Sequence, residues 1–359
     1  MIWKMAKEAA LDRSLTFINF AAPSQNQNME SAATDPFANI YFVGSTFNGE
    51  DNDTLLIKLD KHRNIVWTRS LNNGSEEFAY AVTVDPLTLD VFISGFELVG
   101  AEYHALIAAY DNSGELKWKQ TFARSIVSAY YAILWHQNRL YVVGEVFNGQ
   151  HFEALISSYD KQGHLLWDNS LAMNGTDKTA YALDVLCEPQ CKLVVAGSED
   201  KNKGWLATLE PDIGSIIQQG FVAFPIFALK TKDSAIIAAG NSELDSLVIN
   251  LDAQLNVNWQ TALGFKQDNA LRTLGIDTEG FIYLAGRLFN GNNEDGFVSV
   301  LTKNGDKIST LPLDIKADET ATGLIVNIEN QLFVVGQTFN ETNNKLLIFR
   351  INTGKSIAK

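Results

Sequence analysis

Short apolar runs alternate with polar turns along the whole chain. A run of four or five apolar residues that ends in glycine occurs seven times, and about ten residues after each glycine a second apolar run begins. Runs of this length are typical of β-strands that are buried on both faces, as in the middle strands of a sheet packed between neighbours. The glycines that end the first runs are Gly44, Gly95, Gly144, Gly197, Gly240, Gly286 and Gly336.

Successive glycines of this series lie 43 to 53 positions apart, which indicates one unit repeated seven times. Four units continue into a turn that begins at an aspartate and reaches a tryptophan seven residues later, as Asp111 and Trp118 do. The aspartate side chain starts such a turn, and the tryptophan anchors the next strand between sheets. Repeats of this length made only of short strands are typical of β-propellers. We therefore predict an all-β fold, a single seven-bladed β-propeller of four-stranded blades.

The seventh repeat has no fourth strand of its own, because only five residues follow Gly354. Residues 15–20 have the required pattern: Phe17 precedes Asp35 by 18 positions, as Trp67 precedes Asp85. We expect the N-terminal strand, residues 15–20, to complete blade seven and to close the ring, which leaves no free sheet edge at the join. This divides the chain into an N-terminal extension, residues 1–14, and a propeller, residues 15–359.

The repeat resembles the bacterial β-propeller repeat family, which is distantly similar to quinoprotein-type repeats and is found largely in secreted or envelope proteins. The resemblance covers residues 15–359. It rests on the strand-ending glycine, the Asp-to-Trp spacing and an acid before the third strand, such as Glu153. Blades four and six depart from it, with Ile217 and Ser309 at the tryptophan position. The resemblance implies a secreted or periplasmic protein, although residues 1–14 carry charges where a signal peptide is apolar.

The charge balance limits the classes of partner. With 42 acidic and 28 basic residues the formal net charge is −14, so the field of the protein repels phosphate backbones, and we expect no nucleic-acid partner. No apolar run approaches the roughly 18 to 20 residues that a membrane-spanning helix needs. No Gly-x-Ser-x-Gly elbow is present either, and no other catalytic motif supports an enzyme. These observations favour a binding protein over an enzyme.

Acidic side chains precede the first strand of several blades. Loops that join the second and third strands, and connections between blades, emerge on one side of a propeller, which we call the top face. The acids in the blade connections could bind a hard cation, with calcium as the first choice, or a basic partner. The alternative is that they form a solvated acidic surface without a ligand. We expect Glu77, Asp268 and Glu319 at equivalent positions, two residues before Ala79, Ala270 and Ala321. With Asp177, they are the acids expected at the channel mouth.

Three tyrosines, Tyr80, Tyr130 and Tyr181, occur at matching points of the first strand in blades two, three and four. Two interpretations stay open for them. They line a ligand pocket on one side of the central channel, or they pack between blades as large core residues.

The two cysteines, Cys187 and Cys191, flank a turn sequence between two apolar runs, so they can lie opposite each other on a hairpin. Unpaired thiols and a disulfide both stay open, and a disulfide would imply an oxidising compartment. A zinc site would need more ligands than this pair supplies, and the five histidines show no paired metal spacing.

Taken together, the residues predict a non-enzymatic propeller that presents its top-face loops to a protein or another extended ligand. The alternative is a metal-binding or hydrolytic propeller that uses the acidic channel rim. The choice between them rests partly on analogy at the level of the fold.

Overall fold

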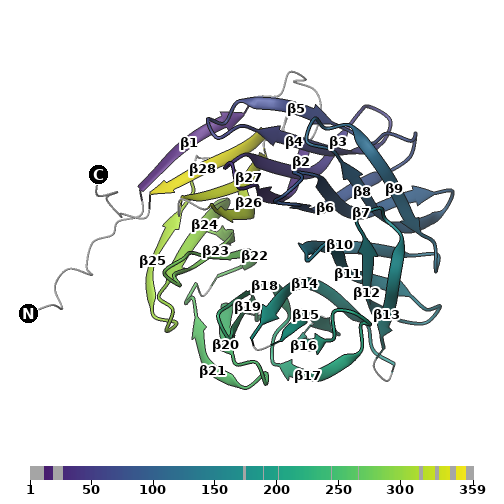
Figure 1. Cartoon of the computed structure of the whole chain (residues 1–359). Helices are drawn as coiled ribbons and strands as arrows, with labels where there is room; N and C mark the ends of the chain where they lie inside the picture. The colour runs from purple at the N-terminus through teal and green to yellow at the C-terminus, as the bar shows by residue number, and fades with distance from the viewer. Residues whose placement is uncertain are drawn as a thin grey trace, which may run out of the picture.

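The computed structural model describes residues 12–18, 27–172, 175–188, 190–200, 202–243, 245–265, 267–314, 318–327, 331–339 and 345–352. Within these ranges 28 strands form seven antiparallel sheets of four strands each. Figure 1 shows the sheets arranged as blades around a central axis. The prediction of an all-β, seven-bladed propeller with four-stranded blades is confirmed.

Blades one to six each take four consecutive strands, with the first nearest the axis and the fourth at the rim (Figure 1). Blade one contains β2 (Gln27–Thr34), β3 (Ile40–Phe47), β4 (Asn52–Leu59) and β5 (Ile65–Arg69). Blade two contains β6 (Glu77–Val84), β7 (Val91–Val99), β8 (Glu102–Tyr110) and β9 (Leu116–Phe122). Blade three contains β10 (Ser128–His136), β11 (Arg139–Phe147), β12 (Phe152–Asp160) and β13 (Leu165–Leu171). Blade four contains β14 (Lys178–Cys187), β15 (Cys191–Glu199), β16 (Lys203–Leu209) and β17 (Ile216–Val222). Blade five contains β18 (Ile226–Lys232), β19 (Ala235–Asn241), β20 (Ser246–Leu251) and β21 (Val257–Ala262). Blade six contains β22 (Asn269–Ile276), β23 (Ile282–Phe289), β24 (Glu294–Leu301) and β25 (Lys307–Pro312).

The seventh sheet combines the two ends of the described chain. It contains β26 (Asp318–Val326), β27 (Leu332–Phe339) and β28 (Lys345–Asn352), and its outermost strand is β1 (Asp12–Ile18). β1 pairs antiparallel with β28, from Asp12 opposite Asn352 to Ile18 opposite Leu346. The strand therefore begins three residues before the predicted start at residue 15. The predicted last residues, Asn19 and Phe20, and residues 1–11 lie outside the described part of the chain.

Seven apolar clusters form the core, each between adjacent blades. In β3, Tyr41 and Val43 pack against blade two, whereas Phe42 faces the other way and packs with Phe333 of blade seven. Successive side chains of a strand point to opposite faces, so a strand buried on both faces has a continuous apolar sequence. Full burial of one such side chain stabilises the fold by about 1.5–3 kcal/mol.

The repeated glycine makes room for a bulge in the innermost strand. Gly95 lies opposite Ala79, and a Cβ atom at Gly95 would lie 1.8 Å from the carbonyl oxygen of Phe78. The first strand bulges directly after Ala79, so that Tyr80 has no partner in the ladder. A bulge of this kind turns the extra side chain away from the regular pleat. Every blade has the same close approach and the same register shift.

The predicted Asp-to-Trp turn is confirmed in detail. Oδ1 of Asp111 accepts hydrogen bonds from the backbone amides of Ser113 and Glu115, at 2.8 and 3.0 Å. The indole of Trp118 then donates to the carbonyl oxygen of Lys161 in the next blade, at 3.0 Å. The tryptophan thus anchors its strand against the neighbouring blade, as the sequence predicts.

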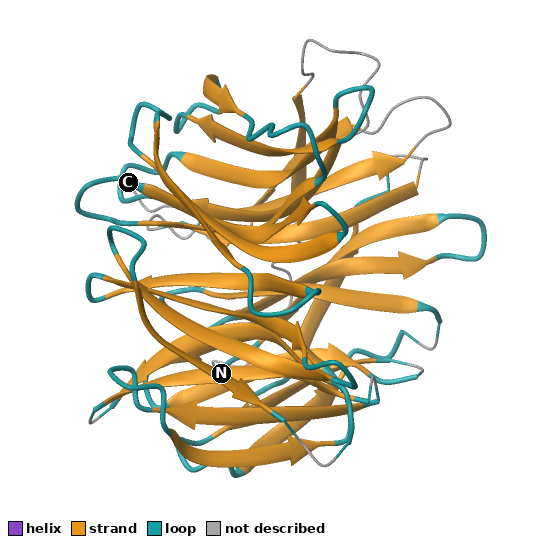
Figure 2. Ribbon diagram, turned by 90° about the vertical axis from the view of Figure 1, so that its right-hand side faces the viewer, coloured by secondary structure: helices purple, strands orange, loops and turns teal. Residues whose placement is uncertain are grey.

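The loops lie on two opposite sides of the ring, where the antiparallel strands reverse direction (Figure 2). One side is the top face defined above. The other, which we call the bottom face, holds the turns between first and second and between third and fourth strands. No helix in the described ranges has the length and apolarity that a membrane crossing requires.

Candidate functional site at the top face and central channel

A cavity of about 500 Å³ lies on the axis and is lined by the first strands of all seven blades. The bulge in each of these strands contributes one side chain to its wall. We call these seven side chains the channel ring: Glu30, Tyr80, Tyr131, Tyr181, Phe227, Arg272 and Thr322.

Four consecutive members of the channel ring are aromatic. Ring centroids are 5.2 Å apart between Tyr80 and Tyr131, 5.6 Å between Tyr131 and Tyr181, and 5.2 Å between Tyr181 and Phe227. These separations are those of direct aromatic contact, so blades two to five present one continuous aromatic wall. Such a wall binds apolar, planar or cationic groups. The rest of the ring is polar and carries one acid, one base and one hydroxyl.

The tyrosines of the wall stay protonated over the physiological pH range. Burial, together with the Glu30 and Glu145 carboxylates, raises the pKa of Tyr80 to about 12. The Tyr131 hydroxyl donates to Oε1 of Glu145 at 2.7 Å, and burial together with this acceptor raises its pKa. Burial also raises the pKa of Glu30, which the nearby Arg272 guanidinium partly offsets. The wall is therefore neutral, with one acid and one base beside it.

Two of the three predicted tyrosines, Tyr80 and Tyr181, line the channel, but the third does not. Tyr130 is fully buried, and its hydroxyl bonds those of Ser157 and Tyr159, each at 2.9 Å. The channel interpretation of Tyr130 is wrong, and packing between blades is the correct alternative for it. Tyr131 occupies the channel position because it is the unpaired bulge residue, as Tyr80 and Tyr181 are in their blades, whereas Tyr130 pairs with Gly144.

The predicted acids do not line the channel. Glu77 and Glu319 are fully buried at equivalent positions, two residues before the residue that pairs with the repeated glycine. Asp268 is exposed and is not their equivalent, because Leu271 rather than Ala270 pairs with Gly286. Asp177 is also exposed and accepts a hydrogen bond from the backbone amide of Phe152 at 2.9 Å.

Glu77 lies near two other acids, Asp53 of blade one and Glu97 of blade two. Its Oε1 accepts the backbone amide of Asn73 at 3.1 Å, and its buried Oε2 has no hydrogen-bond partner within the described structure. Burial raises the pKa of Glu77 to about 7, and the Asp53 and Glu97 carboxylates raise it as well. Glu77 is therefore partly protonated at neutral pH.

A second acidic group occupies the matching place between blades six and seven. Oxygen atoms of Asp295, Asp314 and Glu319 lie within 4.8 Å of one another. Asp295 and Glu319 correspond in register to Asp53 and Glu77. Hard cations prefer several carboxylate oxygens, so this group has the composition of a calcium site. One of the acids, Glu319, is a residue that the sequence singled out.

Blade two carries an exposed apolar surface on the top face, which we call the blade-two patch: Val99, Tyr103 and Ile126. Their exposed fractions are 47%, 42% and 53%. The backbone amide of Tyr103 donates to the carbonyl oxygen of Ile126 at 3.0 Å, which holds the two segments together. The patch is continuous with the aromatic wall, since the Phe96 ring lies 5.3 Å from that of Tyr103 and 5.8 Å from that of Tyr80.

Comparison with known proteins identifies the fold. No protein-family model and no curated protein sequence matches the chain. The WD40 β-propeller domain of Doa1 is similar in structure, with a TM-score of 0.63 and 12% identity over 95% of this chain and 97% of that one. A chain of the Kuenenia stuttgartiensis hydrazine synthase gives a TM-score of 0.64 and 9% identity over 92% of this chain and 97% of that one. Chaetomium thermophilum Sqt1, solved bound to the N-terminus of the ribosomal protein L10, gives a TM-score of 0.56 and 10% identity over 90% of this chain and 97% of that one. At these identities the likenesses show a WD40-like β-propeller fold and identify no sequence family.

Proposed function

We propose that the protein is a non-enzymatic binding module that holds an extended segment of a partner protein across its top face. The observation that carries the proposal is the unbroken aromatic path from the exposed Tyr103, through Phe96 and Tyr80, into the channel. Exposed aromatic and apolar side chains that lead into a concave site are typical anchors of protein recognition.

The charge of the top face specifies the chemistry of the partner. Exposed acids such as Glu50, Asp177 and Asp268 lie in top-face loops, and the whole chain carries a net charge of −14. A segment with apolar side chains for the blade-two patch and Lys or Arg for these acids complements the surface. Sqt1 is a propeller of similar fold that was solved with the N-terminus of another protein bound, which supports this mode of binding.

The proposal includes the way the ring is held closed. We propose that β1, rather than a strand from the C-terminal end, completes blade seven of the propeller and covers the edge of β28. The antiparallel register from Asp12 to Ile18 supports it.

A second candidate function is cation binding at Asp295, Asp314 and Glu319. The short separations among their oxygens favour it. In this alternative the cation fixes the connection between blades six and seven, and the acids near the top face act through the metal rather than on a basic partner.

Selection from a phage-displayed library of random peptides tests the first proposal. We expect enriched peptides that combine Lys or Arg with aromatic or branched apolar residues. The double variant Tyr103→Ala/Ile126→Ala should weaken binding by about tenfold or more, since loss of a central apolar anchor commonly costs over 1 kcal/mol.

The matched control is Phe37→Ala/Leu87→Ala, which removes two apolar side chains exposed by 65% and 91% in bottom-face turns. It should leave peptide binding unchanged. Equal losses in the two double variants, or peptides without basic residues, would contradict the proposal.

A further inference from the structure

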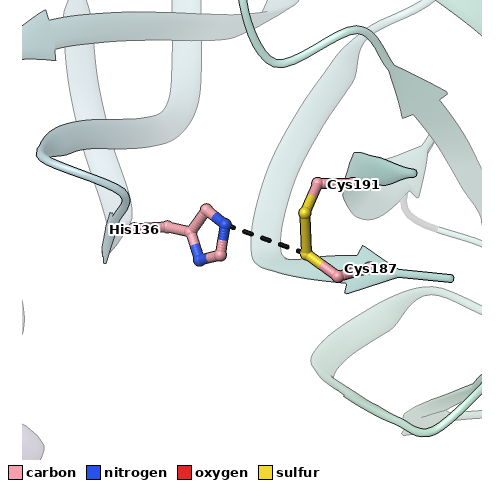
Figure 3. Close-up of side chains that lie close together, drawn as sticks. All are labelled: His136, Cys187 and Cys191. Atoms are coloured by element: carbon pink, nitrogen blue, oxygen red, sulfur yellow. Dashed lines mark hydrogen bonds between the residues drawn. A yellow bond between two sulfur atoms is a disulfide. The ribbon is translucent and has the colours of Figure 1, made fainter. Parts of the chain in front are cut away.

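Two hairpin turns on the bottom face bring a histidine beside the cysteine pair. In blade three, Gln137 and Asn138 form a tight turn with φ of 47° and 65°, and His136 is the last residue of β10 before it. In blade four, Cys187 is the last residue of β14 and pairs in register with Cys191, the first residue of β15. Figure 3 shows the imidazole of His136 directed at the two sulfurs.

The three side chains make a compact group of soft ligands. Nε2 of His136 lies 3.8 Å from Sγ of Cys187, and the ligand atoms of all three residues lie within 4.8 Å of one another. The side-chain amide of Gln137 lies 3.9 Å from Sγ of Cys191. In the structure the cysteines form a disulfide, so their sulfurs are joined to each other.

We propose that reduction of the Cys187–Cys191 disulfide creates a binding site for a zinc-type divalent cation, with His136 as the third protein ligand. An external dithiol supplies two electrons and two protons, so that the S–S bond breaks into two thiols while the dithiol becomes a disulfide. Metal binding then releases two protons from the thiols. Two thiolates and a neutral imidazole balance the charge of the cation, and solvent occupies the fourth position.

The distances suit this ligand set. A tetrahedral zinc ion with bonds of about 2.3 Å to sulfur and about 2.0 Å to nitrogen separates those two ligands by roughly 3.5 Å, close to the Sγ–Nε2 distance of 3.8 Å. The same geometry separates two sulfurs by about 3.8 Å, which is also close to their van der Waals contact after reduction.

The backbone keeps the cysteines together whether or not the bond is present. Their Cα atoms lie 3.8 Å apart at the last pair of the β14–β15 ladder. Nine residue pairs of that ladder hold the hairpin, so reduction leaves the thiols facing each other. Oxidation removes both thiolates at once, and the redox state of this pair therefore controls metal binding. Cys187 is exposed, which gives the reductant access.

Cobalt(II) titration of the reduced and the oxidised protein tests the proposal, because thiolate coordination of cobalt gives a charge-transfer absorption. We expect one cobalt ion per chain in the reduced protein, displaced by zinc, and no such absorption in the oxidised protein. His136→Ala should weaken binding by about tenfold or more, since even the loss of a group that only orients a metal ligand costs 10- to 100-fold.

His164→Ala is the matched control, because it removes another histidine from a bottom-face turn, bonded to Asp160 rather than to a cysteine. It should leave the titration unchanged. His136→Gln, with circular dichroism of every variant, separates loss of the ligand from loss of fold. No charge-transfer band in the reduced protein, or the same affinity in His136→Ala and His164→Ala, would overturn the proposal.

Discussion

The indole of Trp118 lies directly over Gly163 of the next blade. A Cβ atom at Gly163 would lie 2.8 Å from Cε3 of the indole, and the adjacent Lys161 carbonyl accepts the indole N–H. The glycine has a φ of +84°, so the same residue permits both the turn and the contact. A tryptophan and a glycine meet in the same way at three other blade boundaries, in the pairs Trp67–Gly114, Trp167–Gly214 and Trp259–Gly305.

Replacing Gly163 by alanine should destabilise the fold by about 2–4 kcal/mol. Strain at positive φ costs about 1 kcal/mol, and displacement of the indole adds about 1–3 kcal/mol. Gly149→Ala is the control, because Gly149 has a φ of +99° and its added Cβ would meet no atom within 4 Å. It should cost about 1 kcal/mol in urea unfolding. Similar losses at the two positions would show that the indole contact contributes nothing.

Trp118→Ala should itself cost about 3 kcal/mol, at the low end for a tryptophan because the ring is only partly buried. In this background Gly163→Ala should cost no more than Gly149→Ala, since the steric partner is gone. A double-mutant cycle from urea unfolding measures the coupling, which should exceed about 1 kcal/mol. Additive effects would argue that the two residues do not act on each other.

Removal of residues 1–22 should destabilise the propeller far more than removal of residues 1–11. The longer deletion takes away β1 and exposes the backbone groups of β28 along seven paired residues. An uncovered edge also pairs with other chains, so concentration-dependent aggregation should accompany the lower melting temperature. Identical melting temperatures and solution behaviour for the two truncations would count against closure of the ring by β1.

The strands could be predicted from local sequence because burial on both faces leaves a continuous apolar run and the glycine recurs with it. The side chains of the channel could not all be predicted, because a bulge breaks the alternation of faces. Tyr131 rather than Tyr130 faces the axis because Tyr130 pairs with Gly144 and Tyr131 is the unpaired residue of the bulge. The repeated glycine is the only local sign of the bulge in the sequence. The glycine is required because the first strand approaches it closely, and that approach is visible only in the fold.

Contacts between blades are the other part that the sequence did not predict. His136 lies 51 positions before Cys187, and only the packing of two blades brings the imidazole to the sulfur. The sequence pattern places Asp268 one residue out of register, because Ala270 rather than Leu271 resembles Ala79 and Ala321 of blades two and seven. The register is determined by the pairing of Leu271 with Gly286, and no residue near Asp268 indicates that pairing in the sequence.

Calcium should stabilise the protein if Asp295, Asp314 and Glu319 bind it. At a free concentration 100 times the dissociation constant, a ligand that binds only the folded state raises the free energy of unfolding by about 2.7 kcal/mol. Asp314→Asn should abolish the calcium-dependent rise in melting temperature, whereas Asp268→Asn, an equal charge change at another exposed acid, should retain it. Absence of a shift at millimolar calcium in the wild-type protein would eliminate this candidate function.

The stability of the fold should fall between about pH 4.5 and pH 7 because of Glu77. Burial raises its pKa from 4.5 to about 7 in the folded chain, so the folded state binds the proton more tightly than the unfolded state. This contribution is complete below pH 4.5 and is lost as the pH rises through about 7. Glu77→Gln cannot ionise, so its free energy of unfolding relative to wild type should rise from pH 5 to pH 8. Urea unfolding at the two pH values measures the change, with Glu50→Gln as the exposed control that removes one charge from the same face. If the difference between Glu77→Gln and wild type is the same at both pH values, the carboxyl does not titrate in this interval.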